Sequence, residues 1–223
     1  MALSKLKYNS LNVTPAANKG IGFDSGADDL STDFAGGDIR FIKKLTASSS
    51  ATISFVDGTS DVVLDNTYKE YLFTFNNMHP ATDNAEFQFN LSVDSGSNYN
   101  VAKTTTLFKA RLSEADGIQE LGYETASDLA QGTGAQPFTY AGIENHNDAS
   151  LSGYLRIFDP SSTTFVKHFL SGCNYMAASG TDSVAYNSFI AGYGNTTSAV
   201  DAIQFSMSSG NVDAGDICLY GIN

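Results

Sequence analysis

The feature that most constrains the fold is a strict alternation of apolar and polar residues near the middle of the chain. The apolar positions are Phe87, Phe89, Leu91 and Val93, and the polar positions between them are Gln88, Asn90 and Ser92. Successive side chains of a strand point to opposite faces, so this run predicts a β-strand with one apolar and one wet face. Nowhere does the sequence show an apolar period of convincing helical length, which disfavours α/β folds.

Further short apolar runs follow one another at roughly regular spacing, separated by turn-forming residues. Turns are predicted at Asp57-Gly58, at 94–98 and at Asp159-Pro160, because Asp, Gly and Pro favour turn geometries. Strands are predicted from Ile39 to Leu45 and at 51–56, 68–76, 87–93, 101–112, 151–158, 163–176, 188–193, 199–207 and 216–222. The runs at 151–158 and 163–176 are expected to pair as a hairpin. The pattern as a whole predicts an all-β fold, a jelly-roll-like β-sandwich.

Two regions depart from this pattern. Residues 1–38 carry many glycines and scattered aspartates with sparse apolar residues, which predicts an extended N-terminal anchoring arm or a few short strands without a core of their own, with a floppy terminus as the alternative. Residues 39–223 are expected to form the β-sandwich domain. Within it, residues 113–150 are mixed in character and predict a long functional loop that contains short strands, with one helical turn at 127–131.

Composition supports the same fold class. Charged residues are only 16% of the chain, against about 25% in average soluble domains. Ser, Thr, Asn and Gly take their place, and these residues suit short strands joined by many turns. Aromatic residues make up 12% and supply the apolar area that offsets the entropy of ordering.

The net charge argues against a nucleic-acid partner, and the short apolar runs argue against Sec export and membrane insertion. The net charge is −12, from 24 acidic and 12 basic residues, and a nucleic-acid backbone would repel such a chain. The segment after Lys5 and Lys7 lacks the long apolar core of a signal peptide, so no Sec export is expected. Since no run approaches the roughly 20 apolar residues of a membrane span, no membrane insertion is expected either.

The sequence offers no strong catalytic or metal-binding constellation. The three histidines, His79, His146 and His168, lie in a turn, a polar loop and a strand, with no sign that they converge. Cys173 and Cys218 lie outside any CxxC pair, which favours two buried thiols and leaves a disulfide between them open. We therefore expect no catalytic residues, no cofactor and no metal ligands.

Carboxylates raise two weaker alternatives. Asp residues recur every four positions at 57, 61 and 65 and cluster at 24, 28 and 29. Neither group fits a calcium-binding loop, so solvated acidic loops are favoured. A glycosidase needs two acids about 5–10 Å apart across a cleft, and sugar clefts commonly offer a Trp platform, which this chain lacks.

Tyrosines and amides offer a more general binding chemistry. Asn, Ser, Thr and Tyr on loops bind sugars or proteins through adaptable hydrogen bonds and flat apolar contact. The segments 113–150 and 186–197 are the candidates for such a surface, against the alternative of ordinary polar loops.

Several segments resemble a family of virion-associated proteins of tailed bacteriophages that infect marine bacteria, including cyanophages. The resemblance is carried by residues 5–17 (KLKYNSLNVTPAA), 44–65 (KLTASSSATISFVDGTSDVVLD), 68–80, 195–205 (NTTSAVDAIQF), 209–215 (SGNVDAG) and 219–222 (LYGI). It covers nearly the whole chain and is weakest at 113–150 and 173–190. The SGN…LYGI ending is its most specific part, and it contains no catalytic motif.

The resemblance implies a location and a role. It implies a non-enzymatic virion structural protein, made in the host cytoplasm and exposed on the particle as a tail-fibre, receptor-binding or capsid-decoration component. Residues 1–38 would contact other virion proteins, and homo-oligomers, including a trimer, are expected because phage particles are symmetric. The alternatives are an adhesin module that binds a host-surface glycan and, less favoured, a polysaccharide depolymerase.

Overall fold

A computed structural model of the chain describes residues 22–23, 30–31, 39–179 and 182–223. The chain divides into two units, Met1–Arg40 and Phe41–Asn223, and each is described by itself. In the first unit, β1 (Gly22–Phe23) pairs antiparallel with β2 (Leu30–Ser31). The remainder of the predicted arm at 1–38 lies outside the described residues.

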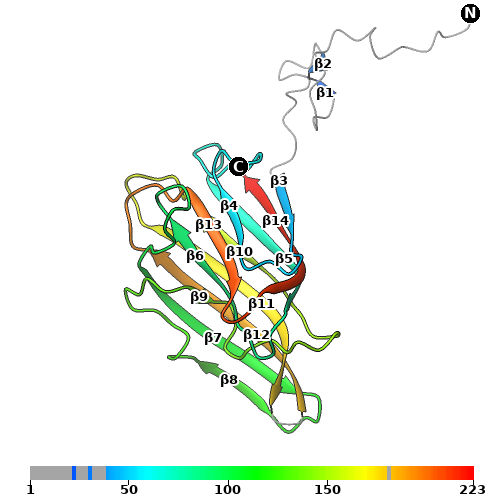
Figure 1. The fold of residues 1–223 in the computed structure, drawn as a ribbon. Coiled ribbons are helices and arrows are strands. Elements are labelled where there is room, and N and C mark those ends of the chain that lie inside the picture. The colour runs from blue at the N-terminus through cyan, green and yellow to red at the C-terminus, as the bar shows by residue number, and fades with distance from the viewer. Residues whose placement is uncertain (1–21, 24–29, 32–38, 180–181) are drawn as a thin grey trace, which may run out of the picture. The chain divides into compact units, whose positions relative to one another are not determined.

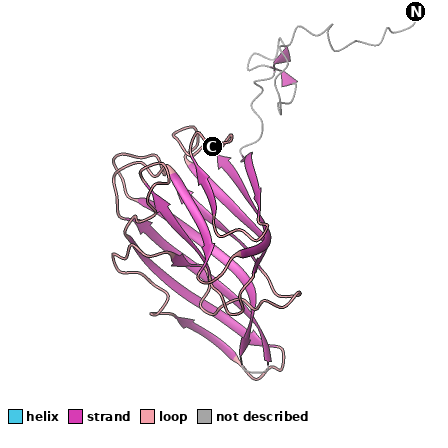
Figure 2. Ribbon diagram, viewed as in Figure 1, coloured by secondary structure: helices cyan, strands magenta, loops and turns pink. Residues whose placement is uncertain are grey.

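Twelve strands follow, and no helix occurs among the described residues (Figures 1 and 2). They are β3 (Ile39–Thr46), β4 (Ile53–Val56), β5 (Glu70–Pro80), β6 (Phe87–Ser92), β7 (Lys103–Ser113), β8 (Gln119–Tyr123), β9 (Gln136–Pro137), β10 (Leu151–Phe158), β11 (Lys167–Ser179), β12 (Asp182–Gly194), β13 (Ala202–Met207) and β14 (Val212–Ile222). The predicted all-β class is thus confirmed, and none of the described residues forms a helix that could cross a membrane.

The strands form two antiparallel sheets that pack face to face. One has eight strands in the order β3-β14-β5-β10-β11-β12-β7-β8, and the other has four in the order β4-β13-β6-β9. When the neighbouring pairs β7–β8 and β11–β12 are set aside, the two sheets have the orders β3-β14-β5-β10 and β4-β13-β6-β9. Successive strands then alternate between the sheets, except that β6 and β9 are neighbours in the same sheet, as in a jelly roll. The two pairs extend one sheet of the jelly roll to twice the width of the other, as Figure 1 shows.

Each predicted strand overlaps one of these elements, but the bounds differ, since the strands predicted at 163–176 and 199–207 begin only at Lys167 and Ala202. Two further differences concern burial and length. The run at 87–93 forms β6 and buries Phe87, Phe89 and Leu91, but its second face is not wet, because Asn90 and Ser92 are buried as well. The strand predicted at 188–193 is much longer and begins at Asp182. The expected hairpin of β10 and β11 is confirmed by their antiparallel register.

Phenylalanine rings hold the two sheets together. Phe205 lies on β13 in the smaller sheet and is fully buried. Its ring centroid is 5.4 Å from those of Phe73 and Phe75 on the larger sheet, 5.9 Å from Phe87 and 6.2 Å from Phe55. Edge-to-face and stacked rings at these distances add to the burial of apolar area.

The long segment between β8 and β10 covers the inner face of the sheet extension. Phe138 from this segment is buried and stacks on Phe89 at 5.0 Å. Gln136 accepts a hydrogen bond from the Thr105 hydroxyl at 2.6 Å, and the hydroxyl of Tyr175 accepts one from the Tyr140 amide at 2.9 Å. The functional loop predicted at 113–150 is therefore largely a structural cover, and the helical turn predicted at 127–131 is absent.

The covered face buries three lysines. Lys103 and Lys109 point inward from β7 and Lys167 from β11, and all are at most 1% exposed. Lys109 is neutralised, because its ammonium pairs with Glu124 and lies 3.3 Å from the centre of the Tyr140 ring. The Lys103 ammonium has neutral partners, the Asn90 side-chain oxygen at 2.5 Å and the Val101 carbonyl at 2.9 Å. Burial lowers the pKa of Lys103 to about 8.

We predict that Phe205→Ala lowers the free energy of unfolding by about 3–5 kcal/mol, because it leaves a cavity among packed rings. Urea unfolding followed by near-ultraviolet circular dichroism measures the change. Phe165→Ala is the matched control, since that ring is 69% exposed in the β10–β11 connection. A similar loss in both variants would contradict the packing described here.

We predict that wild type gains stability relative to Lys103→Met by about 2 kcal/mol between about pH 8 and pH 10. In this window the unfolded chain, with an ordinary lysine pKa of 10.5, keeps a proton that folded Lys103, with a pKa of about 8, has released. Stability rises with pH wherever the unfolded state binds more protons. Urea unfolding at several pH values measures it, with Lys69→Met, whose side chain is 73% exposed, as the control. A difference that stays constant with pH would rule the effect out.

Candidate functional site

The three histidines do not converge. The Nδ1 atom of His79 lies 3.6 Å from an Asp213 carboxylate oxygen, and its Nε2 atom is 3.1 Å from the backbone carbonyl of His146. A carbonyl only accepts, so this Nε2 donates its proton there and is not free to act as a base. His168 lies elsewhere, on the outer face of β11, 6.0 Å from the Tyr193 ring. Among the described residues no group of three metal-ligating side chains gathers.

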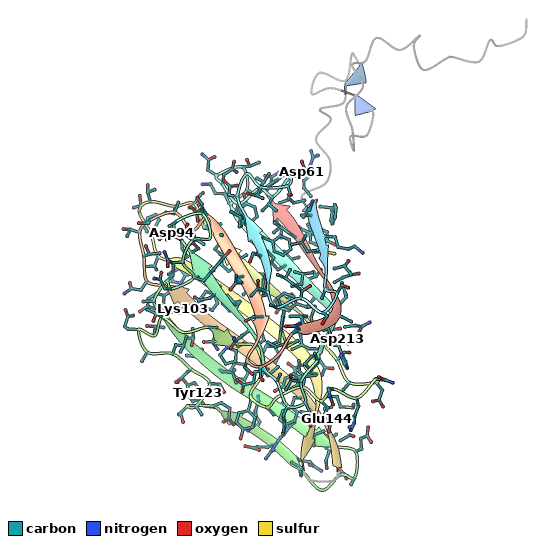
Figure 3. The ribbon with its side chains drawn as sticks, viewed as in Figure 1. Asp61, Asp94, Lys103, Tyr123, Glu144 and Asp213 are labelled. Atoms are coloured by element: carbon teal, nitrogen blue, oxygen red, sulfur yellow. The ribbon has the colours of Figure 1, made fainter. Side chains whose placement is uncertain are left out.

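A polar hollow of about 450 Å³ adjoins His79. It is lined by Asn77, His79, Asn147, Asp148, Ala149, Ser150, Asp213 and Ala214. Asp213, labelled in Figure 3, pairs with the imidazole, and no buried nucleophile or second ion pair is placed in the lining. Among the described residues this hollow is an open polar recess in which no reactive arrangement of side chains is placed.

The aspartates at 57 and 65 have turn-forming roles. Asp57 accepts a hydrogen bond from the Leu64 amide, and Asp65 accepts one from the Thr67 amide, each at 2.8 Å. Hydrogen bonds from Thr67 lower the pKa of Asp65. Asp61, labelled in Figure 3, lies in the same connection in a left-handed conformation with φ of 65°. The cluster at 24, 28 and 29 lies outside the described residues.

The two cysteines are free and buried, as the sequence favoured. Cys173 points inward from β11, and Cys218 belongs to the opposite face of the same sheet on β14, three strands away. Neighbouring strands are about 4.8 Å apart, so the pair lies well beyond the Cα separation that a disulfide spans. Burial raises the pKa of the Cys173 thiol to about 12.

The tyrosine-rich segment at 186–197 is mostly strand β12 and not a loop. Tyr186 points inward, where its ring stacks on Tyr175 at 5.2 Å, so it is closed to a ligand. Tyr193 points outward. It lines a shallow, mainly apolar hollow of about 400 Å³ with Thr104, Thr106, Phe158, His168 and Leu170 among its neighbours.

The sequence reasoning missed an exposed apolar surface, which is the outer face of the eight-stranded sheet over its extension. We call it the aromatic face and define it by seven outward side chains, Leu121 and Tyr123 on β8, Phe108 and Leu112 on β7, Phe189 on β12, Leu170 on β11 and Tyr154 on β10. All seven are exposed large hydrophobic residues. Tyr123 is labelled in Figure 3.

The strand register lines up four of these rings in one row. Tyr123 is the cross-strand partner of Phe108, and Phe108 is the partner of Phe189. The rings of Phe108 and Phe189 stack with centroids 5.1 Å apart. The next partner is Gly172, whose missing side chain leaves space that the Tyr154 ring covers, since an added Cβ would lie 3.1–3.3 Å from that ring.

The aromatic face exists because β7 has an inverted polarity. Its charged residues Lys103, Lys109 and Arg111 point toward the interior, whereas Phe108 and Leu112 point toward solvent. β8 has the same inverted polarity, because its Glu120 points inward and pairs with Arg111 at 2.5 Å and with Lys109 at 3.6 Å. The signal in the sequence was the run LFKARL, which has apolar residues in both alternating registers.

Comparisons with known proteins add no relative. A scan against protein-family models, a search of curated proteins and a search of solved structures each find no significant match.

Proposed function

We propose that this chain is a non-enzymatic structural protein of a tailed-phage virion, exposed on the particle as a tail-fibre, receptor-binding or capsid-decoration component. The observation that carries the proposal is the aromatic face, a broad apolar surface beside which the charged side chains of β7 turn inward. Such a surface is made for contact with other proteins, since large exposed apolar patches mark interaction sites.

Two further observations support the proposal. Jelly rolls are the architecture of viral capsid and lectin domains, although a fold alone does not determine a function. The segments that resemble marine-phage virion proteins extend from residues 5–17 to the LYGI ending at 219–222. The fold and the resemblance therefore favour the same role independently.

In this proposal the two parts of the chain have different tasks. Residues 1–38 attach the protein to other virion proteins, and the sandwich faces solvent, where it forms homo-oligomers. The net charge of −12 keeps the free subunit soluble and away from packaged nucleic acid. The protein is synthesised in the host cytoplasm and ends on the virion.

We predict that deleting residues 1–38 abolishes incorporation into particles and leaves the sandwich folded, because the core lies entirely in 41–223. Incorporation is measured by immunogold labelling and mass spectrometry of purified particles of the phage that encodes this chain. Folding is measured by circular dichroism. Replacing 1–38 with a Gly/Ser-rich segment of equal length is the control for spacing. Normal incorporation of the truncated chain would refute the anchoring role, and absence of the wild-type chain from particles would refute the virion role.

The hollow beside Tyr193 favours a second candidate function, the binding of a host-surface glycan. An aromatic ring, an imidazole and the Thr104 and Thr106 hydroxyls surround a shallow apolar floor. Aromatic faces with adjacent hydroxyls suit the mixed polar and apolar surface of a sugar ring.

We predict that Tyr193→Ala weakens glycan binding at least roughly tenfold, the effect of losing about 1.4 kcal/mol of contact. A glycan array followed by titration calorimetry with the best saccharide measures it. Tyr99→Ala is the control, since Tyr99 is a tyrosine outside the lining of the hollow. Equal binding by both variants, or none by wild type, would dismiss this second function.

A further inference from the structure

The aromatic face has the size of a protein interface. Its seven side chains are between 38% and 76% exposed, and taking about 200 Å² for each fully exposed side chain gives roughly 700 Å² of surface. A standard interface buries about 800 Å² on each partner, whereas the largest apolar patch on a typical monomer is about 300–600 Å². The face therefore exceeds what a monomer ordinarily leaves in water.

The centre of the same surface carries no formal charge. Over the described parts of β7, β8, β11 and β12, the outward positions hold no Asp, Glu, Lys or Arg, and His168 is their only histidine. Charges occur at its borders, where Arg156 on β10 lies opposite Leu170 and pairs with Glu70, and where Asp128 accepts a hydrogen bond from the Tyr123 hydroxyl at 2.5 Å. Interface cores are depleted of charge and enriched in aromatic residues in the same way.

Charge also indicates which partner fits. Two copies of a chain with a net charge of −12 repel each other over most of their surface. The aromatic face is where they can meet without bringing carboxylates together, and it leaves the acidic loops in solvent. Most soluble oligomers are symmetric assemblies of one chain. An uncharged face offers no sign by which an oppositely charged partner would be selected.

The inverted polarity of β7 indicates that the aromatic face is a binding surface for a second copy and not an accidental apolar patch. Turning Lys103 and Lys109 inward requires the Asn90 oxygen, the Glu124 carboxylate and the Tyr140 ring to receive their ammonium groups. Burying cations is costly unless partners are placed for them. The opposite register would have hidden Phe108 and Leu112 and exposed the lysines without such partners.

We propose that the aromatic face binds a second copy of this chain, and that β7, β8 and β12 form the centre of the interface. The inference deepens the proposed function by naming the surface through which the subunits assemble. Its test uses purified protein alone. A chain that self-associates but is absent from particles would therefore refute the virion role and leave this interface standing.

The test is sedimentation velocity of the full chain over roughly 1–100 µM, comparing wild type with Leu121→Glu and Phe189→Lys. Leu121 is the most exposed residue of the face, at 76%, so its replacement is compatible with folding. Phe165→Glu is the control, because it places the same charge on a ring that is 69% exposed but lies outside the face. Thermal unfolding of each variant verifies that it is folded.

Wild type and Phe165→Glu are expected to form the same oligomer, and both face variants are expected to weaken association at least roughly 30-fold. A monomeric wild type across the range would overturn the proposal, as would oligomers that persist in both face variants. A chain without residues 1–38 tests the other possible occupant of the face, which is the N-terminal arm itself. If the full chain is a monomer and the chain without residues 1–38 forms an oligomer, the arm covers the face in the intact chain and the second copy is the wrong partner.

Discussion

The structure depends on a mismatch in width between its two sheets. Four strands can cover only half of an eight-stranded sheet, so the inner surface over β7, β11 and β12 needs another cover. The segment between β8 and β10 supplies it, since Gln136 binds Thr105 on β7 and Tyr140 binds Tyr175 on β11. Because this cover is a loop rich in polar backbone groups, the surface beneath it accommodates hydrogen-bonding side chains that a sheet-on-sheet core would reject.

The polar lining under the loop in turn determines the outer surface. Side chains alternate along a strand, so every lysine that β7 sends inward is followed by a residue sent outward. In β7 those outward residues include Phe108 and Leu112, and they join Phe189 and Tyr154 across the sheet. A single choice of register on one inserted strand thus produces both the buried cations and the exposed aromatic rings.

Much of the sandwich could be predicted from sequence, because its strands report their burial through alternation. The run at 87–93 and the Asp159-Pro160 turn each led to the correct local structure. The inverted polarity of β7 could not be predicted, because apolar residues such as Phe108 and Leu112 in a period-two pattern normally indicate the face that packs on the core. The contacts of Gln136 and Tyr140 with the opposite face come from residues distant in the sequence, so no local pattern indicates them. Likewise, the segment 113–150 looked like a functional loop because its contacts with β7 and β11 are non-local.

The location of the two thiols has a chemical consequence for how the folded chain responds to oxidants. With a pKa near 12, about one Cys173 side chain in 100,000 is a thiolate at neutral pH, and the thiolate is the species that oxidants attack. Cys218 lies across the sheet from it and has no second sulfur within bonding distance. Under oxidising conditions the folded chain is therefore expected to keep both thiols, without an intrachain disulfide or a rearrangement of its sulfur atoms.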